Sequence, residues 1–288
     1  MKFYCLHEDL YEGVQIRLDQ LENACKKLNV EFININSSFI NHLNLPQLNK
    51  SDLLYNSAKG SQTMESLLLN EQVTTFYIKN PPINQSYSTT DWTIIHTKSN
   101  LPQPKTIFHL TPNRTLLKNY IDYLGGFPVI IKAVGSTRGI GTIKIESWQN
   151  LISTIDYLVT TGDKYILRQF IKAKSGCRMI VLGNEVIAAA DFAMNENDFR
   201  NAVDLKQAKY FKRQYPEYLK QVAVNATHLA NTEFSGVDFL EDENGDYHLL
   251  EINFPTGFSG LIDVCEVDIP GNMVEYLIAK SLQQSKEI

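Results

Sequence analysis

Three polar residues near the C-terminal end of the chain carry the oxygen atoms that magnesium prefers as ligands. Asp238 lies in the apolar stretch GVDF, and Glu251 and Asn253 lie in the apolar stretch LLEIN. The turn-like segment 242–246 separates the two stretches, which predicts antiparallel neighbouring strands. Glu251 and Asn253 alternate with one residue between them and therefore share a strand face. Two carboxylates and an amide predict a Mg²⁺ site, with Mn²⁺ as a second candidate and an ordinary polar hairpin as the alternative.

A lysine and a glycine-rich loop in the middle of the chain have the chemistry to bind phosphate groups. Lys132 stands in the apolar stretch VIIKA, where a lysine seldom occurs without a partner. The loop GSTRGIG follows, and its candidate phosphate-binding residues are Gly135, Ser136, Thr137, Gly139 and Gly141. The loop lacks the order of a P-loop, but glycines let backbone N–H groups approach phosphate oxygens closely. A plain hairpin is the alternative interpretation.

The first part of the chain alternates predicted strands with predicted helices. The strands are Lys2–His7, Val30–Ile35, Leu53–Tyr55 and Thr74–Ile78, and the helices are Val14–Leu28 and Met64–Leu69. Such alternation is typical of a parallel sheet covered by helices. We therefore expect an N-terminal α/β domain over residues 1–88, which ends near the break Asn80-Pro81-Pro82.

The remainder of the chain predicts two further modules. The middle contains predicted helices Asp91–Lys98 and Trp148–Val159 and predicted strands Pro128–Ala133, Thr142–Ile145 and Tyr165–Ile171. The last part contains predicted strands Met179–Leu182, Val186–Ala190 and Leu249–Ile252 and predicted helices Tyr218–Thr232 and Met273–Leu282. We expect a small central α+β domain over residues 89–168 and a C-terminal domain with an antiparallel sheet over residues 169–288.

Composition restricts the class of protein and its partners. The chain has 288 residues, of which 43% are hydrophobic and 20% are charged, as in globular proteins. Its net charge of -5 disfavours nucleic acid as a partner, because phosphate backbones call for a basic surface. The four cysteines form no CxxC pair, which is typical of reduced thiols. The first residues lack a signal-peptide pattern, and no apolar run reaches the ~18 residues of a membrane span. We therefore expect a cytoplasmic protein that does not act in a membrane.

Together the motifs resemble the ATP-grasp superfamily over about residues 89–284, and in particular its RimK and LysX branch. The resemblance depends on three segments in this order: PVIIKAVGSTRGIGTIKI, YILRQFIKAKSGCRMIVLGNEVIAA and SGVDFLEDENGDYHLLEINFPTG. The segments LPQPKT and VDIPGNMVEYL resemble the LysX type. The resemblance implies an ATP-grasp fold, in which ATP binds between a central lid domain and the C-terminal domain.

The resemblance also implies roles for individual residues. Lys132 would contact the α- and β-phosphates, loop 135–141 would close over the phosphates, and Arg178 would lie near the phosphate end. The residues that match the adenine-binding hinge are Gln169, Phe170 and Ile171, and those that match the metal ligands are Asp238, Glu251 and Asn253.

Several motifs depart from the family pattern, among them Gly176-Cys177-Arg178 in place of Asp-Ile-Arg, and Asn201-Ala202-Val203 in place of the arginine–glycine–glycine segment after Phe199-Arg200. The Asp-Lys pair whose lysine binds ATP reads Asp91-Trp92 here, and the Gln-Glu pair of the hinge reads Arg168-Gln169.

The activity that the resemblance implies is ATP-dependent joining of a carboxylate to an amine through an acylphosphate. The substrates would be an amino acid or another amine and a peptide, a protein or a small carboxylic acid. A carrier protein for one substrate and a homodimer stay open. Arg200, in a basic stretch, and Thr256 and Gly257, after the metal-ligand strand, are the substrate-binding candidates, with a solvated surface as the alternative for Arg200. A small-molecule kinase and a non-catalytic ATP-binding module are the alternative functions, and the missing lysine favours the second.

Overall fold

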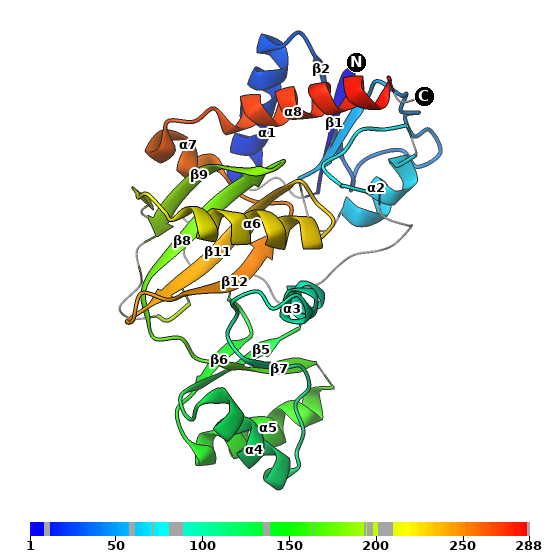
Figure 1. The fold of residues 1–288 in the computed structure, drawn as a ribbon. Coiled ribbons are helices and arrows are strands. Elements are labelled where there is room, and N and C mark those ends of the chain that lie inside the picture. Colours follow the sequence, from blue (N-terminus) through cyan, green and yellow to red (C-terminus); the bar gives the residue numbers. More distant parts are fainter. Residues whose placement is uncertain are drawn as a thin grey trace.

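The chain is built from three β-sheets and the helices that cover them (Figure 1). The structure is a computed structural model, and it describes residues 1–8, 12–57, 61–70, 72–80, 89–134, 139–162, 164–192, 194, 198–200 and 210–286. Within these ranges one sheet is parallel and two are antiparallel, which confirms the predicted fold class. None of the helices in the described ranges combines the length and the apolar character that a membrane span requires.

The N-terminal sheet is parallel, with the strand order β2-β1-β3. Its module contains β1 (Lys2–His7), α1 (Glu12–Lys27), β2 (Glu31–Asn36), β3 (Leu53–Asn56) and α2 (Gln62–Leu68). Side chains of β1 alternate between two cores, because Phe3 and Cys5 pack with residues of α1 whereas Tyr4 and Leu6 pack with residues of α2. Both faces of the sheet are therefore covered, which explains why β1 and β3 are apolar without alternation.

One predicted strand does not form a regular strand. In the described residues, segment Thr74–Ile78 makes two isolated bridges, from Thr74 to Leu53 and from Tyr77 to Thr232. The prediction was wrong because the apolar character of this segment reflects side-chain packing. The ring of Phe76 lies 5.0 Å from that of Phe234, between centroids.

The central sheet is antiparallel, with the strand order β4-β7-β5-β6. Its elements are β4 (Thr106–Ile107), α4 (Arg114–Leu124), β5 (Val129–Ala133), β6 (Thr142–Ile145), α5 (Trp148–Thr161) and β7 (Tyr165–Gln169). Helix α3 (Thr89–Lys98) precedes them in the chain but packs in the core beneath α6 of the C-terminal module. Helices α4 and α5 bury one face of this sheet in a separate core that contains Val129, Ile131 and Leu167. The alternate residues, which include Lys132 and Arg168, therefore point to the opposite face.

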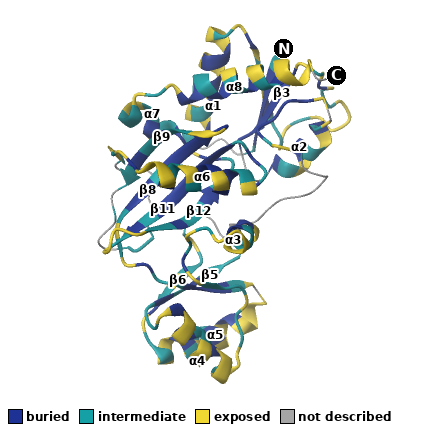
Figure 2. Ribbon diagram, in the orientation of Figure 1, coloured by how far each residue is buried: buried dark blue, intermediate teal, exposed yellow. Residues whose placement is uncertain are grey.

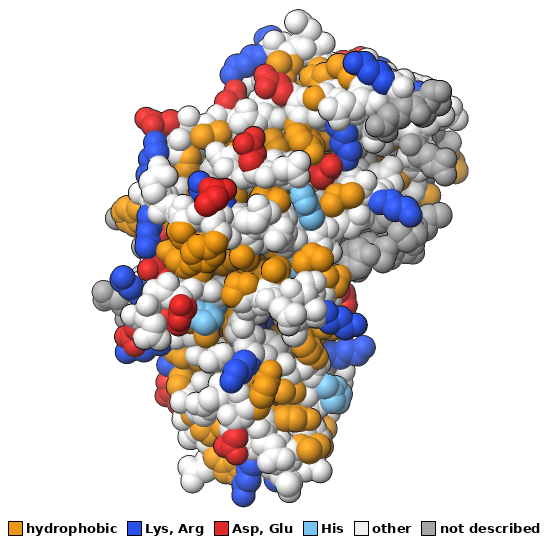
Figure 3. Space-filling model, in the orientation of Figure 1, with side chains coloured by type: hydrophobic (Ala, Val, Ile, Leu, Met, Phe, Trp, Pro, Cys, Tyr) orange, Lys and Arg blue, Asp and Glu red, His pale blue; other side chains and the backbone are white. Residues whose placement is uncertain are grey.

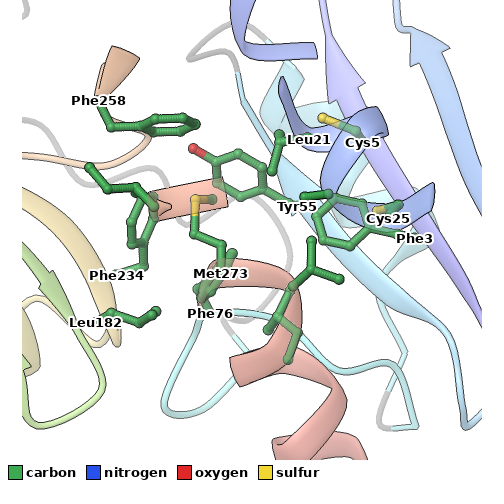
Figure 4. Close-up of a cluster of buried hydrophobic side chains, with 14 of the residues drawn as sticks. Phe3, Cys5, Leu21, Cys25, Tyr55, Phe76, Leu182, Phe234, Phe258 and Met273 are labelled. Carbon is green, nitrogen blue, oxygen red and sulfur yellow. The ribbon is translucent and has the colours of Figure 1, made fainter. Parts of the chain in front are cut away.

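The C-terminal sheet is antiparallel, with the strand order β10-β9-β8-β11-β12. Its elements are β8 (Ala173–Leu182), β9 (Glu185–Phe192), β10 (Tyr210–Lys212), α6 (Glu217–Leu229), β11 (Phe234–Asp242), β12 (Tyr247–Asn253), α7 (Ser259–Cys265) and α8 (Ile269–Gln284). Helix α6 covers one face, and α7, α8 and the N-terminal module cover the other. Figure 4 shows this second core, in which Tyr55 lies between Phe3 on one side and Phe234 and Phe258 on the other.

The central module stands apart from the rest of the molecule. In Figure 2 the strands β5 and β6 lie above the helices α4 and α5, whose outer faces are exposed, and these helices lie far from the N-terminal sheet. Figure 3 shows this module as a narrower lobe below the larger body, with acidic and basic side chains interspersed on the face drawn. The domain limits 1–88, 89–168 and 169–288 stay a prediction.

Candidate active site

Strands β11 and β12 bring the three predicted metal ligands onto one face of the C-terminal sheet. Asp238 pairs in register with Glu251, and Gly236 pairs with Asn253, which confirms that the two strands are antiparallel neighbours. The intervening residues Val237 and Ile252 point the other way, into the core beneath α6. Asp238, Glu251 and Asn253 therefore share the face turned away from α6.

A β-bulge directly precedes Glu251 on β12. Asp238 pairs with Glu251, but the next residue, Phe239, pairs with Leu249, so Leu250 is an extra residue. In a regular strand Leu249 and Glu251 would share a face. Here Leu249 is buried beneath α6, whereas Glu251 contacts Lys132 of the central module. The bulge thus turns the Glu251 carboxylate out of the core.

Lys132 and Glu251 connect the central and C-terminal sheets. The Nζ atom of Lys132, on β5, lies 3.1 Å from Oε2 of Glu251, on β12. The side chains are 17% and 24% exposed, so the ion pair is only partly screened by solvent. The sequence predicts a partner for Lys132 in its apolar strand, and this partner is Glu251, one of the predicted metal ligands.

Arg178 on β8 neutralises the second carboxylate. Its Nε and Nη2 atoms each donate to a carboxylate oxygen of Asp238 at 2.7 Å, a two-point contact that suits the planar guanidinium. Burial raises the pKa of the Asp238 carboxyl above its ordinary value, and the charge of Arg178 opposes that shift. Asn253 donates from Nδ2 to Asp238 Oδ2 at 3.2 Å. This hydrogen bond keeps Asn253 next to the Asp238 carboxylate.

The donor set is compatible with a magnesium ion that also takes phosphate oxygens. It offers two carboxylates and one amide on a single face, and Mg²⁺ completes its octahedron with waters or phosphate oxygens. No cluster of three or more His, Cys, Asp or Glu residues that could hold a metal occurs in the described part of the chain. The assignment of Asp238, Glu251 and Asn253 to a metal stays a prediction.

Arg168 is a residue of this region for which the sequence analysis predicts no role. It is 4% exposed, and its Nη1 atom donates to the carbonyl oxygen of Leu250 at 3.1 Å. Burial lowers the pKa of Arg168 to about 10. The sequence contains a signal for it, because an arginine within the apolar stretch YILRQF is as unusual as the lysine within VIIKA.

The predicted hinge residues lie where β7 leaves the central sheet and the chain enters β8. Gln169 is the last residue of β7, and its backbone N–H donates to the carbonyl oxygen of Lys105 at 2.9 Å. The Nζ atom of Lys144 lies 4.8 Å from the ring centroid of Phe170. Ile171 is buried. The three residues are therefore at the junction of the two sheets, and adenine binding by their backbone stays a prediction.

The glycine-rich loop is described only at its end. Gly135, Ser136 and Thr137 lie outside the described residues. Gly139 and Gly141 have φ angles of 70° and 74°, a left-handed conformation that favours glycine. A Cβ atom on Gly139 would lie 3.2 Å from Cβ of Arg200, so the end of the loop passes beside this predicted substrate residue.

The predicted substrate residues occupy two separate places. Arg200 is held by Asp198 through Nε and Nη2 at 2.9 and 2.8 Å, next to the loop. Thr256 is buried against Gly236, which lies two residues before Asp238 on β11. A Cβ atom on Gly257 would lie 3.6 Å from Nη1 of Arg17, so an arginine of α1 borders this turn.

Trp92 belongs to a hydrophobic core of the C-terminal module. Its side chain is buried in the core beneath α6, together with Met179 and Leu219. The structure therefore uses Trp92 for packing at the position where the family pattern has a lysine.

Comparison with known proteins establishes the family. A family model described as the RimK-like ATP-grasp domain matches residues 93–277. The chain belongs to the RimK-like ATP-grasp family. A curated relative is the ribosomal protein bS6–L-glutamate ligase of Escherichia coli O7:K1 (strain IAI39 / ExPEC), which is 30% identical over 159 residues. The match covers 54% of this chain and 52% of that protein, so the chain spans about half the length of the curated relatives it matches.

Solved structures show that the fold is shared over the whole chain. The ATP-grasp ligase PsnB in complex with its minimal precursor has a TM-score of 0.75 and 17% identity, and the match covers 97% of this chain and 99% of PsnB. A further PsnB structure also contains Mg and ADP. D-alanine–D-alanine ligase from Bacillus anthracis has a TM-score of 0.70 and 15% identity, with 100% of this chain and 99% of that chain covered. The chain thus has the fold of ATP-grasp ligases.

Proposed function

We propose that this protein is an ATP-dependent ligase that joins a carboxylate to an amine. The observation that carries the proposal is the contact between Lys132 and Glu251. It brings a phosphate-binding candidate of the central sheet to the metal-ligand candidates of the C-terminal sheet, at 3.1 Å. Membership of the RimK-like ATP-grasp family supports the same activity.

ATP and magnesium fit the residues that surround this contact. Lys132 would hold the α- and β-phosphates, and the backbone of Gln169, Phe170 and Ile171 would hold adenine. Asp238, Glu251 and Asn253 would hold Mg²⁺, the ion that accompanies ADP in a PsnB structure. Bound Mg²⁺ would neutralise phosphate charge during transfer. Lys132 neutralises Glu251 and Arg178 neutralises Asp238, and we expect nucleotide binding to transfer Lys132 from Glu251 to phosphate.

The proposed reaction has two steps. A carboxylate oxygen of the first substrate attacks the γ-phosphorus of ATP, which forms an acylphosphate and releases ADP. The amine of the second substrate then attacks the acyl carbon, inorganic phosphate leaves, and the amine loses a proton. Lys132 and Arg178 would stabilise the charge on the transferring group, and the sheet scaffold would hold the reactants close together.

The first substrate is proposed to be a carboxylate of a peptide or a protein, and the second an amino acid or another amine. The relatives support this class, because one is named for ribosomal protein bS6 and L-glutamate and another is bound to a precursor. Arg200, beside the glycine-rich loop, and the turn at Thr256 and Gly257 are the proposed substrate contacts.

An ATP turnover assay tests the proposal. Purified protein would be incubated with ATP, Mg²⁺ and pools of peptides, carboxylic acids and amines, with ADP and product masses as readouts. We expect ADP together with a condensed product that lacks one water. Glu251→Ala should abolish both signals. Glu243→Ala is the matched control, because Glu243 is an exposed acid of the turn between β11 and β12 and should leave turnover unchanged.

Two other outcomes would overturn the ligase proposal. A product that is heavier by one phosphoryl group would identify a kinase. Tight ATP binding without turnover across all pools would favour a non-catalytic module.

A further inference from the structure

Arg168 joins the hinge strand of the central sheet to the bulge that orients Glu251. The residue lies on β7, one position before the hinge, and its Nη1 atom donates to the carbonyl oxygen of Leu250. Leu250 is the extra residue of the bulge. Strand β12 is the outermost strand of its described sheet, so no further strand there offers donors to its outer edge. Arg168 supplies a donor at that edge.

Burying the Arg168 side chain costs folding free energy that a purely structural residue would not need to cost. Its side chain is 4% exposed, and among the described residues its Nε and Nη2 atoms have no hydrogen-bond partner. The acid that raises its pKa, against the effect of burial, is Glu251. A buried charge with unmade hydrogen bonds destabilises a fold, and an apolar residue of similar volume commonly fills such a site at lower cost.

The bulge that Arg168 contacts decides the direction of the Glu251 side chain. The side chain of Leu249 points into the core beneath α6, whereas that of Glu251 points to the opposite face of the sheet. The extra residue Leu250 between them allows both orientations. Bulges occur preferentially beside active sites, where they redirect a side chain. A charged donor on the carbonyl oxygen of Leu250 favours the bulged backbone over a regular pairing.

We propose that Arg168 is a positioning residue that holds the bulge at Leu250 and so keeps the Glu251 carboxylate directed toward a divalent metal. The inference rests on the proposed function, because it assumes that Glu251 binds the metal of a metal–nucleotide complex. Since the hinge begins at the next residue, Arg168 also connects nucleotide binding to metal binding. The two ligands should therefore strengthen each other's binding through it.

Calorimetric titration with ADP, in EDTA and in Mg²⁺, measures this coupling without a substrate. For the native protein we expect Mg²⁺ to tighten ADP binding. Arg168→Leu should bind ADP normally in EDTA. The factor by which Mg²⁺ tightens its ADP binding should be about tenfold smaller than in the native protein, which is the scale of one hydrogen bond from a charged group. Arg168→Lys, which keeps a charged donor, should recover most of the enhancement.

Arg213→Leu is the matched control. Arg213 also ties strands together, through Glu241 at 2.5 Å and Asp191 at 3.2 Å, but it does so on the face that carries α6. Its loss should lower the melting temperature and leave the Mg²⁺ enhancement unchanged. If Arg168→Leu does not fold, Arg168→Gln takes its place, and its neutral donor should retain part of the enhancement.

The outcomes separate the inference from the function on which it rests. No Mg²⁺ enhancement in the native protein would overturn the proposed function and the inference with it. Normal enhancement in both the native protein and Arg168→Leu would overturn the inference alone. An equal loss of ADP affinity in EDTA and in Mg²⁺ would also overturn it, because a general structural defect acts in both conditions.

Discussion

The two carboxylates of the candidate site form ion pairs with different cations, one with an arginine and one with a lysine. Arg178 contacts Asp238 at two points, and both side chains are largely buried. Lys132 contacts Glu251 at one point, and both side chains are more exposed than Asp238. A lysine is a compact charge on a flexible stem, whereas a guanidinium holds a carboxylate in a fixed plane. We infer that Arg178–Asp238 is a permanent pair and that Lys132 is the cation free to exchange Glu251 for phosphate.

The buried pair yields a prediction about stability. Asp238→Asn should destabilise the protein by about 3–5 kcal/mol, because it leaves the charge of Arg178 buried without its partner. The double variant Arg178→Met/Asp238→Leu should recover much of that loss, because it removes both charges. Urea unfolding of the two variants and of each single change measures the coupling. If the double variant were as unstable as the sum of the single ones, the residues would not act as a pair.

Residue type alone predicts part of this site. A lysine in VIIKA, and an acid and an amide in LLEIN, are unusual enough within apolar strands to indicate a role. Arg168 shows the limit of such reasoning. The hydrogen bond from Arg168 to Leu250 spans 82 positions of the chain, and it depends on a bulge that alternation cannot predict.

At the scale of elements, a glycine on β11 fixes the turn that follows the metal-ligand strand. A Cβ atom on Gly236 would lie 2.2 Å from Oγ1 and 3.1 Å from Cβ of Thr256. Thr256 is buried, so it has little room to retreat. Gly236 therefore lets the chain after Asn253 turn back tightly against β11, toward the proposed substrate contacts.

Gly236→Ala tests this packing. The added methyl group should push the turn away from β11 and cost about 1–3 kcal/mol of stability, as overpacking in a core does. Turnover should fall further than stability alone explains, because Thr256 and Gly257 are proposed to contact substrate. Thermal melts and substrate KM values measure the two effects. Thr256→Ala in the same chain should relieve most of the strain, and its failure to do so would place the clash elsewhere.

The elements themselves were predictable where burial follows a simple pattern. Strands β1 and β6 begin and end at the predicted residues, because β1 is a mostly apolar run and β6 alternates polar and apolar residues. Helix α4 was not predicted, although Asn113 caps it by accepting hydrogen bonds from Thr115 and Leu116 and Gly125 ends it with a φ angle of 94°. Segment Thr74–Ile78 was wrongly predicted as a strand, because periodicity cannot distinguish ladder pairing from aromatic packing.

At the scale of the whole molecule, the cores do not follow the order of the sequence. Phe3 of the first strand shares a core with Phe234 and Met273, whereas Leu151 and Leu167 belong to the core of the central module. The N-terminal and C-terminal modules are therefore packed as one body. Contacts such as Lys132–Glu251 and Arg168–Leu250 join the central module to it. Since the central module has its own core, we expect it to unfold separately from the rest of the chain.

Separate cores predict separate unfolding transitions. Leu151→Ala removes a fully buried side chain from the central core and should cost about 2–5 kcal/mol there. Phe234→Ala should cost about 3–5 kcal/mol in the shared core of the other two modules. In differential scanning calorimetry we expect two transitions, with Leu151→Ala lowering one and Phe234→Ala lowering the other. A single transition that both variants lower equally would show that the contacts between modules make the chain one cooperative unit. In that case, exchange of Lys132 from Glu251 to phosphate would have to occur without independent movement of the central module.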